Sequence, residues 1–558
     1  MSSTDAFFAR FGPGYRWLAT LTAMVAAVAV VLSSTIVNVA IPAIMGQFGI
    51  DSVQAQWLST GFLAAMTVTM LMTAWCERAF GQRMTMIGAL ALFLFGSVVG
   101  GVAPDQTVLV ISRILQGLAA GLVQPLAMVV MFQVFPPQQR GAAMGIFGIG
   151  VVLAPALGPW VGGVLMDNFD WRFLFYLGIP FGVVGIVLAH LFLPGRDRNL
   201  ERQRLDWPAL IYLSVFLLAV LQAISSGQRL GWDSNTVIGE IALALAAGAA
   251  FLWHENRTPH PMLDLRLFAN APFAAACVVS FVLGAGLFGS TYLLPIFVQQ
   301  IQNLTPTQAG LLLMPAGFAL VIVFPLAGKL SDTAPPGVLI GLGMAIFAYA
   351  SWLLSHVSVD TAFWTLAWWT VISRVGMGFV FPSLSAGSLT VLPPRLLSQG
   401  SGAMNFTRQL GGALGTGLLA VMVERRTAFH GDLIAATQTS DNVATAAYMQ
   451  GAGRAIAELG VGGLDQAAAS GWLLGQTVVY QAAAAAYRDG FLVTAIVFAG
   501  ALLPTFILHR ALQSNRKPSA APPTALEAEG DIEAGFALEP VLTDDPGPQR
   551  KSAIWREP

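Results

Sequence analysis

Residues 107–133 read TVLVISRILQGLAAGLVQPLAMVVMFQ, an apolar stretch long enough to cross a membrane as a helix, with Arg113 and Gln116 inside it. An arginine at the centre of a bilayer costs at least about 2.5–3.5 kcal/mol, so its presence predicts a functional position. The next apolar stretch, 141–166, contains a run of small and helix-bending residues: Gly150, Pro155, Gly158, Pro159, Gly162 and Gly163. Glycines allow close helix approach and prolines release backbone carbonyls, so this run favours a helix that packs tightly and bends.

The composition indicates an all-α polytopic membrane protein. Charged residues make up 10% of the 558 residues, against about 25% in soluble proteins, and apolar residues make up 56%. The mean hydropathy is +0.69. The two cysteines, Cys76 and Cys277, lie in apolar surroundings, which excludes a disulfide framework and a thiolate metal site. The histidines are scattered near span ends or in loops. We therefore expect no metal and no cofactor.

Apolar stretches of about 20 residues predict fourteen membrane-spanning helices, arranged as six, an inserted pair and six more. The first six would form an N-terminal half (17–194), followed by a linker that holds the inserted pair (195–272) and a C-terminal half (273–510). We expect the helices near 17–42, 55–75, 83–103, 107–133, 141–166, 172–194, 207–226, 235–254, 273–299, 307–329, 336–356, 361–391, 401–424 and 489–510.

The distribution of basic residues predicts the orientation. With the N-terminus inside, the cytoplasmic segments hold most lysines and arginines, whereas the short outer loops hold little beyond Arg229, so we expect both termini in the cytoplasm. The N-terminal segment 1–16 lacks a small-residue cleavage site near its apolar stretch, so the first span should be retained. We expect an alanine-rich external segment at 425–488 and a disordered cytoplasmic tail at 511–558.

An internal repeat relates the two halves at an offset of eight helices. The loop between helices 2 and 3 carries Glu77, Arg78, Gly81 and Arg83, and the loop between helices 10 and 11 carries Gly328 and Asp332. Arg113 on helix 4 has a counterpart in Arg374 on helix 12. Such repeats are typical of transporters whose halves rock around a site at the midplane, and the two loops would then form the inner gate. The alternative for Gly328–Asp332 is an ordinary basic cytoplasmic loop.

The arginine and glycine-proline motifs, in this order on consecutive spans, resemble the drug:proton antiporters of the major facilitator superfamily. The chain is similar to their fourteen-helix, EmrB/QacA-type branch over nearly all residues up to about 512. Further matches lie at Ser34–Pro42, Trp171–Phe175, Pro261–Phe268 and Asn405–Gly415, and the external segment resembles the EmrB-like subgroup at Gln466-Ala467 and Ala486–Phe491. The resemblance implies multidrug efflux and antibiotic resistance, a bacterial inner-membrane location, and work with a membrane-fusion adaptor and an outer-membrane channel.

Three departures from the family pattern concern proton coupling and the gate. Ser33 stands where the family usually has an aspartate on helix 1, Arg78 occupies the place of the usual aspartate in the loop after helix 2, and Gly178 replaces a common asparagine. Since Arg113 cannot be deprotonated, we expect it to act electrostatically, together with Gln116. Glu240 on helix 8 and Glu424 at the end of helix 13 are candidate proton carriers. The alternative for Glu240 is a solvated residue near a helix start.

We predict a secondary active exporter of hydrophobic and amphipathic compounds, with a mostly apolar cavity between the halves. Its polar contacts would be Asn38, Asn405, Arg408 and Gln409. The scarcity of acids in the spans favours neutral or weakly acidic substrates. A dedicated exporter of one metabolite or siderophore remains open, as does, less well supported, a membrane sensor that does not transport. The sequence shows no catalytic or phosphate-binding motif, so we expect neither an enzyme nor a nucleic-acid partner. For Arg113 the alternative is a purely structural tie between helices, and for Gly150–Gly163 it is packing alone.

Overall fold

The structure is a computed structural model of the whole chain. It describes residues 3–50, 52–196, 205–259, 261–439, 441–458 and 464–514, except for some side chains within the helices. The chain divides into one compact unit, Met1–Gln513, and a second from Ser514. The tail that the sequence predicts to be disordered therefore lies, from residue 515, outside the described residues.

All regular secondary structure in the described ranges is helical, as the sequence predicts. The helices up to the inserted pair are α1 (Ser3–Phe11), α2 (Tyr15–Ile36), α3 (Ile41–Phe48), α4 (Ser52–Gly101), α5 (Gln106–Val134), α6 (Arg140–Asn168), α7 (Phe173–Tyr176) and α8 (Gly178–Phe192). The inserted pair is α9 (Trp207–Leu230) and α10 (Asn235–Glu255). Short 3-10 helices join some of these, at Gly12–Gly14, Val37–Ala40 and Pro137–Gln139.

The remaining helices follow a 3-10 turn at Leu265–Ala269. They are α11 (Ala271–Gln300), α12 (Pro306–Thr333), α13 (Pro336–Leu354), α14 (Phe363–Thr390), α15 (Leu397–Ala436), α16 (Val443–Glu458), α17 (Leu464–Gly500) and α18 (Leu502–Ser514), with one more 3-10 turn at Pro394–Leu396. Ten helical segments of the described chain are long and apolar enough to cross a membrane. The count of fourteen spans stays a prediction.

Local signals in the sequence explain where several helices begin and end. Asp105 caps α5 by accepting a hydrogen bond from the Val108 amide at 2.9 Å, and Thr305 with Gln308 forms a capping box at the start of α12. Gly81 interrupts the long α4 with a φ of +80°, a conformation that favours glycine. The interruption divides α4 at the place where the sequence predicts the loop between helices 2 and 3.

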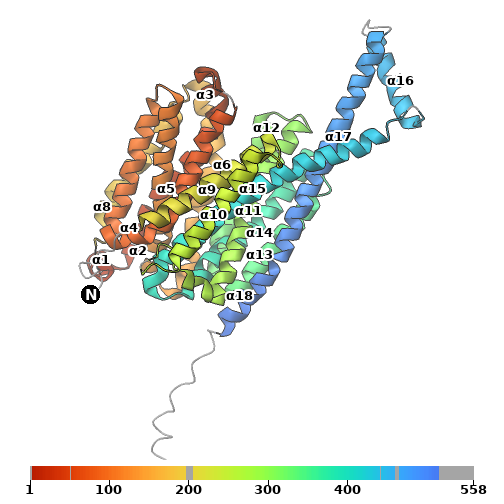
Figure 1. Cartoon of the computed structure of the whole chain (residues 1–558). Coiled ribbons are helices and arrows are strands. Elements are labelled where there is room, and N and C mark those ends of the chain that lie inside the picture. The colour runs from red at the N-terminus through yellow and green to blue at the C-terminus, as the bar shows by residue number, and fades with distance from the viewer. Residues whose placement is uncertain are drawn as a thin grey trace, which may run out of the picture. The chain divides into compact units, whose positions relative to one another are not determined.

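Two groups of helices pack against each other. The first group comprises α2 and α4–α8, and the second comprises α11–α15, α17 and α18; Figure 1 shows them in red to orange and in green to blue. Helix α6 of the first group packs on α12 of the second, and α4 packs on α15. The inserted helices α9 and α10 pack mainly on each other. These two pairings, α6–α12 and α4–α15, bring the predicted gate loops to one end of the bundle.

We name the two ends of the bundle by what lies there. The Gly81 end holds Gly81, Asp332 and the first turns of α6 and α15. At the opposite, hairpin end, α15 continues to Ala436, α17 begins at Leu464, and α16 packs against α17 between them (Figure 1). The external segment expected at 425–488 falls on this hairpin.

Candidate functional site

The buried polar centre of the first group is built around Arg113 on α5, whose side chain is fully buried. Its Nη1 donates to Gln116 Oε1 at 2.7 Å and to the carbonyl and hydroxyl oxygens of Ser33 at 3.2 and 3.3 Å. Its Nε donates to the Leu58 carbonyl at 3.1 Å, and its guanidinium lies 4.3 Å from the centroid of the Phe62 ring. The arginine thus ties α5 to α2 and α4.

Neutral groups supply all the contacts described for Arg113. Across the described residues, no carboxylate forms an ion pair with it, and its Nη2 is buried without a hydrogen-bond partner. Ser33, one of the departures noted in the sequence, accepts from Arg113 as a neutral hydroxyl. A buried cation held only by dipoles is poorly compensated and raises the local preference for negative charge.

The second group repeats this arrangement around Arg374 on α14. Its Nη1 donates to Ser290 Oγ at 3.2 Å and its Nη2 to Thr291 Oγ1 at 3.1 Å, both on α11, the first helix of the group. Its Nη1 also contacts the Met377 sulfur at 3.7 Å, three residues further along, as Arg113 contacts Gln116. The sequence shows the paired arginines, whereas their hydroxyl partners become evident only from the packing.

A third polar cluster lies between the groups, on α15. Asn405 Nδ2 contacts the Met128 sulfur of α5 at 3.5 Å, and Ser401 Oγ donates to the Pro125 carbonyl at 3.0 Å. Arg408 donates to Asn405 Oδ1 and lies 5.0 Å from the centroid of the Phe381 ring of α14. Two of the residues that we predicted to line the cavity therefore lie here. Asn405 contacts the first group directly, and Arg408 contacts Asn405.

Gln409 and Asn38 are the other two residues that we predicted to line the cavity. Gln409 is buried on α15, with 6% of its surface exposed. The side chain of Asn38 lies outside the described residues.

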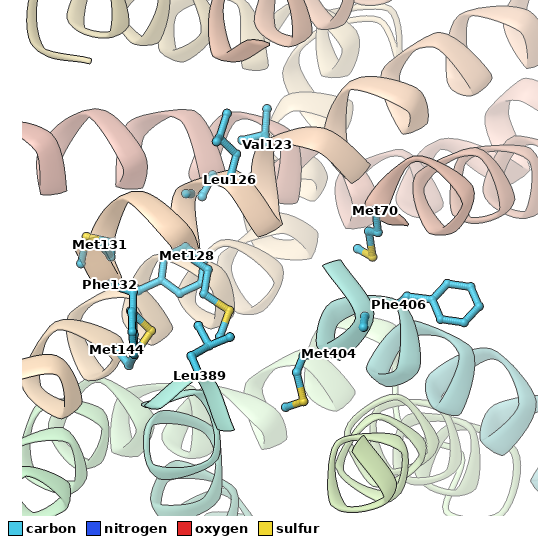
Figure 2. Close-up of a cluster of buried hydrophobic side chains, with 14 of the residues drawn as sticks. Met70, Val123, Leu126, Met128, Met131, Phe132, Met144, Leu389, Met404 and Phe406 are labelled. Carbon is cyan, nitrogen blue, oxygen red and sulfur yellow. The ribbon is translucent and has the colours of Figure 1, made fainter. Parts of the chain in front are cut away.

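Apolar, methionine-rich packing surrounds this interface. Figure 2 shows side chains from both groups in one cluster, contributed by α4, α5, α6, α14 and α15: Met70, Val123, Leu126, Met128, Met131, Phe132, Met144, Leu389, Met404 and Phe406. Methionine is unbranched and polarisable, so such a surface adapts to ligands and partners of different shapes. This apolar cluster lies between the groups, where we predicted a mostly apolar cavity, and the cavity itself stays a prediction.

At the Gly81 end, Asp332 of α12 binds the first turn of α6. Its two carboxylate oxygens accept hydrogen bonds from the backbone amides of Gly141 and Ala142 at 2.6 and 3.0 Å. These are orphan amides at the positive end of a helix dipole, where a carboxylate is favoured. Beside them, α6 and α12 approach closely at Gly328, whose ideal Cβ would lie 2.5 Å from the Gly141 carbonyl oxygen.

Glu77 makes the corresponding contact in the opposite direction. Its Oε2 accepts a hydrogen bond from Ser398 Oγ in the first turn of α15, and its Oε1 accepts from Gln82 at 2.6 Å. Each group thus presents one acid to the beginning of a helix in the other group. The structure brings Glu77, Gly328 and Asp332 of the predicted gate loops to this interface.

The other predicted gate residues contact their own group. Arg83 Nε donates to the Leu193 carbonyl at 2.7 Å, and Arg196 Nε donates to the backbone carbonyl of Arg78 at 3.2 Å. An ideal Cβ on Gly81 would lie 2.5 Å from the Arg196 backbone nitrogen. These contacts hold the α4 interruption against the segment that follows α8.

The glycine-proline run on α6 lies next to α2 in its first part. An ideal Cβ on Gly150 would lie 3.5 Å from the Met24 side chain, an ordinary contact, and Gly158 and Gly162 are buried. Of the same run, the side-chain positions of Pro155, Pro159 and Gly163 lie outside the described residues.

Among the α6 glycines whose surroundings the structure describes, our sequence reasoning missed the one with the shortest contact. An ideal Cβ on Gly145 would lie 2.4 Å from the Phe324 carbonyl oxygen of α12. Gly141 and Gly145 are four residues apart, which is the small-residue spacing of closely packed membrane helices and was the signal available in the sequence.

Glu240, our candidate proton carrier, lies in the inserted pair. Its Oε1 accepts a hydrogen bond from Ser226 Oγ of α9 at 3.2 Å, and its Oε2 is buried without a partner. The structure describes no contact between Glu240 and Arg113, so the two predicted coupling groups belong to separate hydrogen-bond clusters.

A comparison with known families matches residues 23–416 to the description "Major Facilitator Superfamily". The chain belongs to this superfamily. Its similarity to multidrug export proteins confirms the EmrB-like branch that the motifs indicate, and the superfamily identifies it as a polytopic membrane transporter. Human MFSD10, an organic anion transporter, shares the fold with a TM-score of 0.57 at 12% identity, over 89% of this chain and 99% of that chain.

Several bacterial proteins have higher sequence identity to this chain. The chain is 32% identical over 394 residues to the "Multidrug resistance protein B homolog" of Mycobacterium tuberculosis (strain CDC 1551 / Oshkosh), covering 70% of this chain and 73% of that protein. It is 29% identical over 450 residues to the "Multidrug export protein EmrB" of Escherichia coli (strain K12), covering 80% and 86%. It is also 31% identical to the "Uncharacterized MFS-type transporter YhcA" of Bacillus subtilis (strain 168), covering 74% and 77%.

Proposed function

We propose that this protein is a secondary active multidrug exporter that moves hydrophobic and amphipathic compounds by alternating access, in antiport with protons. The observation that carries the proposal is the reciprocal contact at the Gly81 end, where Asp332 binds the start of α6 and Glu77 binds the start of α15. These contacts are hydrogen bonds between side chains and helix starts at one end of the bundle, and they can form and break as the groups rock. The relatives named multidrug export or resistance proteins support the substrate class.

The substrate would bind between the groups, next to Asn405, Arg408, Gln409 and the methionine-rich cluster. We propose a preference for neutral or weakly acidic compounds. Arg113, Arg374 and Arg408 form no ion pair with a described carboxylate, so this part of the protein favours negative charge over positive charge. The charge of a weak acid depends on pH, so its own ionisation would link its distribution across the membrane to the proton gradient.

For proton coupling by the protein, we propose Arg113 and Gln116 as electrostatic elements and Glu240 as the candidate carrier. Arg113 keeps its charge, and it can only change the proton affinity of a neighbour or of the substrate. Glu240 has one buried oxygen without a partner, which suits a group that changes protonation. The Gly150–Gly163 run would let α6 bend and slide during the exchange.

The topology that we propose has fourteen spans, with the two termini and the Gly81 end in the cytoplasm of a bacterial inner membrane. The long helix α4 counts as two spans because Gly81 divides it, and α6, α14 and α15 join the remaining apolar segments. The hairpin of α15, α16 and α17 would then stand outside the membrane, where a membrane-fusion adaptor connected to an outer-membrane channel can bind it.

The experiment is the accumulation of a hydrophobic fluorescent dye and of a weakly acidic uncoupler in energised cells. Cells with the wild-type protein should accumulate less of the substrates than cells without it, and this difference should vanish with Arg113→Ala or a collapsed proton gradient. Arg454→Ala, which removes an exposed arginine on α16, is the matched control and should export normally. Equal accumulation in wild type and Arg113→Ala, with both proteins present in the membrane, would contradict the proposal.

A further inference from the structure

Helix α17 packs against α13 and α15 toward the hairpin end (Figure 1). A cavity of about 450 Å³ lies among side chains of these three helices. It is separate from the arginine clusters and from the contacts at the Gly81 end, because it shares no residue with them. Its lining combines aromatic, basic and apolar side chains: Trp352, Ser355, His356, His430, Ala485, Arg488, Asp489 and Leu492.

The cavity lies at the end of an apolar span, and two of its lining side chains, Trp352 and Leu492, are exposed. The span of α13 ends at Leu354, two residues after Trp352. The Trp352 side chain is 47% exposed and stacks on Tyr349, which is 54% exposed, with 5.9 Å between the ring centroids. Leu492 of α17 is 41% exposed. Exposed Trp and Tyr at a span end are typical of the headgroup level of a bilayer.

The charges in the cavity leave one guanidinium uncompensated. Asp489 accepts hydrogen bonds from Arg426 Nε at 2.5 Å and from His430 Nε2 at 2.8 Å, so two partners share its charge. Arg488 Nε donates to the Ser355 carbonyl at 3.2 Å, and its terminal nitrogens have no hydrogen bond to a described residue. Asp489 is the only acid among the lining residues. The cavity therefore contains the Arg488 guanidinium, whose two terminal nitrogens are available to a ligand at the end of an apolar span.

A second lining group offers an acceptor. His356 Nδ1 lies 2.9 Å from the Trp352 carbonyl oxygen. Because a carbonyl only accepts hydrogen bonds, Nδ1 must carry the proton, and in the neutral ring Nε2 is left as an acceptor. The cavity thus combines a donor fork for a phosphate with an acceptor for a hydroxyl group.

We propose that this cavity binds the phosphoglycerol headgroup of an anionic phospholipid, such as phosphatidylglycerol. The planar fork of Arg488 matches two phosphate oxygens, and His356 Nε2 accepts from a glycerol hydroxyl. Trp352 and Leu492 contact the upper part of the acyl chains. Basic pockets between membrane helices are suited to anionic headgroups. The phosphocholine headgroup of phosphatidylcholine has no net charge and no hydroxyl donor. This inference does not depend on what the protein transports.

The test measures lipid binding to the purified full-length protein in detergent by native mass spectrometry. Wild type should bind phosphatidylglycerol at least tenfold more tightly than phosphatidylcholine of the same chain length. Arg488→Gln should lower the phosphatidylglycerol affinity by about tenfold, as expected for the loss of one charge-assisted hydrogen bond, and leave phosphatidylcholine binding unchanged. Arg454→Gln, an exposed arginine on α16 outside the cavity, is the control and should behave as wild type.

Two further variants and a competitor complete the experiment. Arg488→Lys keeps the charge and should retain most of the binding, and His356→Leu should lower the affinity for phosphatidylglycerol more than that for phosphatidic acid; these two decide the matter if Arg488→Gln does not fold. Soluble glycerophosphoglycerol should compete only weakly. If it displaced the lipid at equal concentration, the ligand would be a soluble phosphodiester and the lipid assignment would be wrong. Equal phosphatidylglycerol affinity in the Arg488 variants, His356→Leu and Arg454→Gln would overturn the proposal.

Discussion

Gly145→Ala should push the two helix groups apart at the Gly81 end. The added Cβ would lie 2.4 Å from the Phe324 carbonyl oxygen and 3.2 Å from the Gly328 Cα. Relieving the first contact requires a shift of about 1 Å, and because the obstacle is backbone, no rotamer change can supply it. Overpacking of this kind costs about 1–3 kcal/mol, which corresponds to a factor of roughly 5–150 in the population of the state described here.

The assay is a distance measurement by double electron–electron resonance. Spin labels on cysteines introduced at Gln138 and Arg395, both exposed, report the separation of the groups at the Gly81 end, and the native Cys76 and Cys277 are buried. Gly145→Ala should decrease the short-distance population and increase a longer one. Gly310→Ala, on α12 with no atom within 4 Å of its ideal Cβ, should keep the wild-type distribution. Identical distributions in the two variants would refute the role assigned to the α6–α12 contact.

Three other substitutions test the remaining clusters. Asp332→Asn leaves one acceptor oxygen for two backbone amides, so the same spin labels should show a shift of about tenfold toward the separated state; an unchanged distribution would mean that the contact is incidental. Arg113→Lys loses the planar guanidinium that bonds to α2 and α4 together, so dye export should fall at least about tenfold with normal expression. Full export by this variant would mean that export needs only the positive charge at this position and not the guanidinium geometry. Thr291→Val removes an acceptor of Arg374 and should cost about 1–3 kcal/mol. That cost is measured as a lower melting temperature in detergent relative to Thr505→Val, because the Thr505 hydroxyl donates only to the carbonyl of Ala501, four residues earlier.

The sequence predicted those features that depend on local spacing. Arg113 and Gln116 are three residues apart on a helix, so their contact follows from helix geometry alone. The interruption at Gly81 follows from a glycine between two apolar stretches, and the structure gives this residue a positive φ. Helical class and the family also follow from local patterns, because apolar length and motifs are read one segment at a time.

Features that depend on which helices meet could not be predicted in this way. Glu240 is one example, since nothing in its neighbourhood in the sequence indicates that Ser226, fourteen residues earlier, would be its partner. Gly145 is another, because its spacing from Gly141 predicts a close contact but does not identify Phe324 as the residue contacted. Both answers require the relative placement of whole helices, which the period of one helix does not contain.

The contacts at the Gly81 end also explain how the chain accommodates its departure from the family pattern. Arg78 occupies the place of the usual aspartate, and the neighbouring Glu77 contacts Ser398 at the start of α15. Asp332 contacts the start of α6. In the predicted order of fourteen spans, α6 is span 5 and α15 is span 13, so the two helix starts are eight spans apart. Backbone amides at a helix start favour a carboxylate through hydrogen bonds and the helix dipole, and the Ser398 hydroxyl there donates a hydrogen bond to Glu77. A reciprocal pair of such contacts therefore needs only one acid from each group, so a glutamate one position earlier can serve where the aspartate is missing.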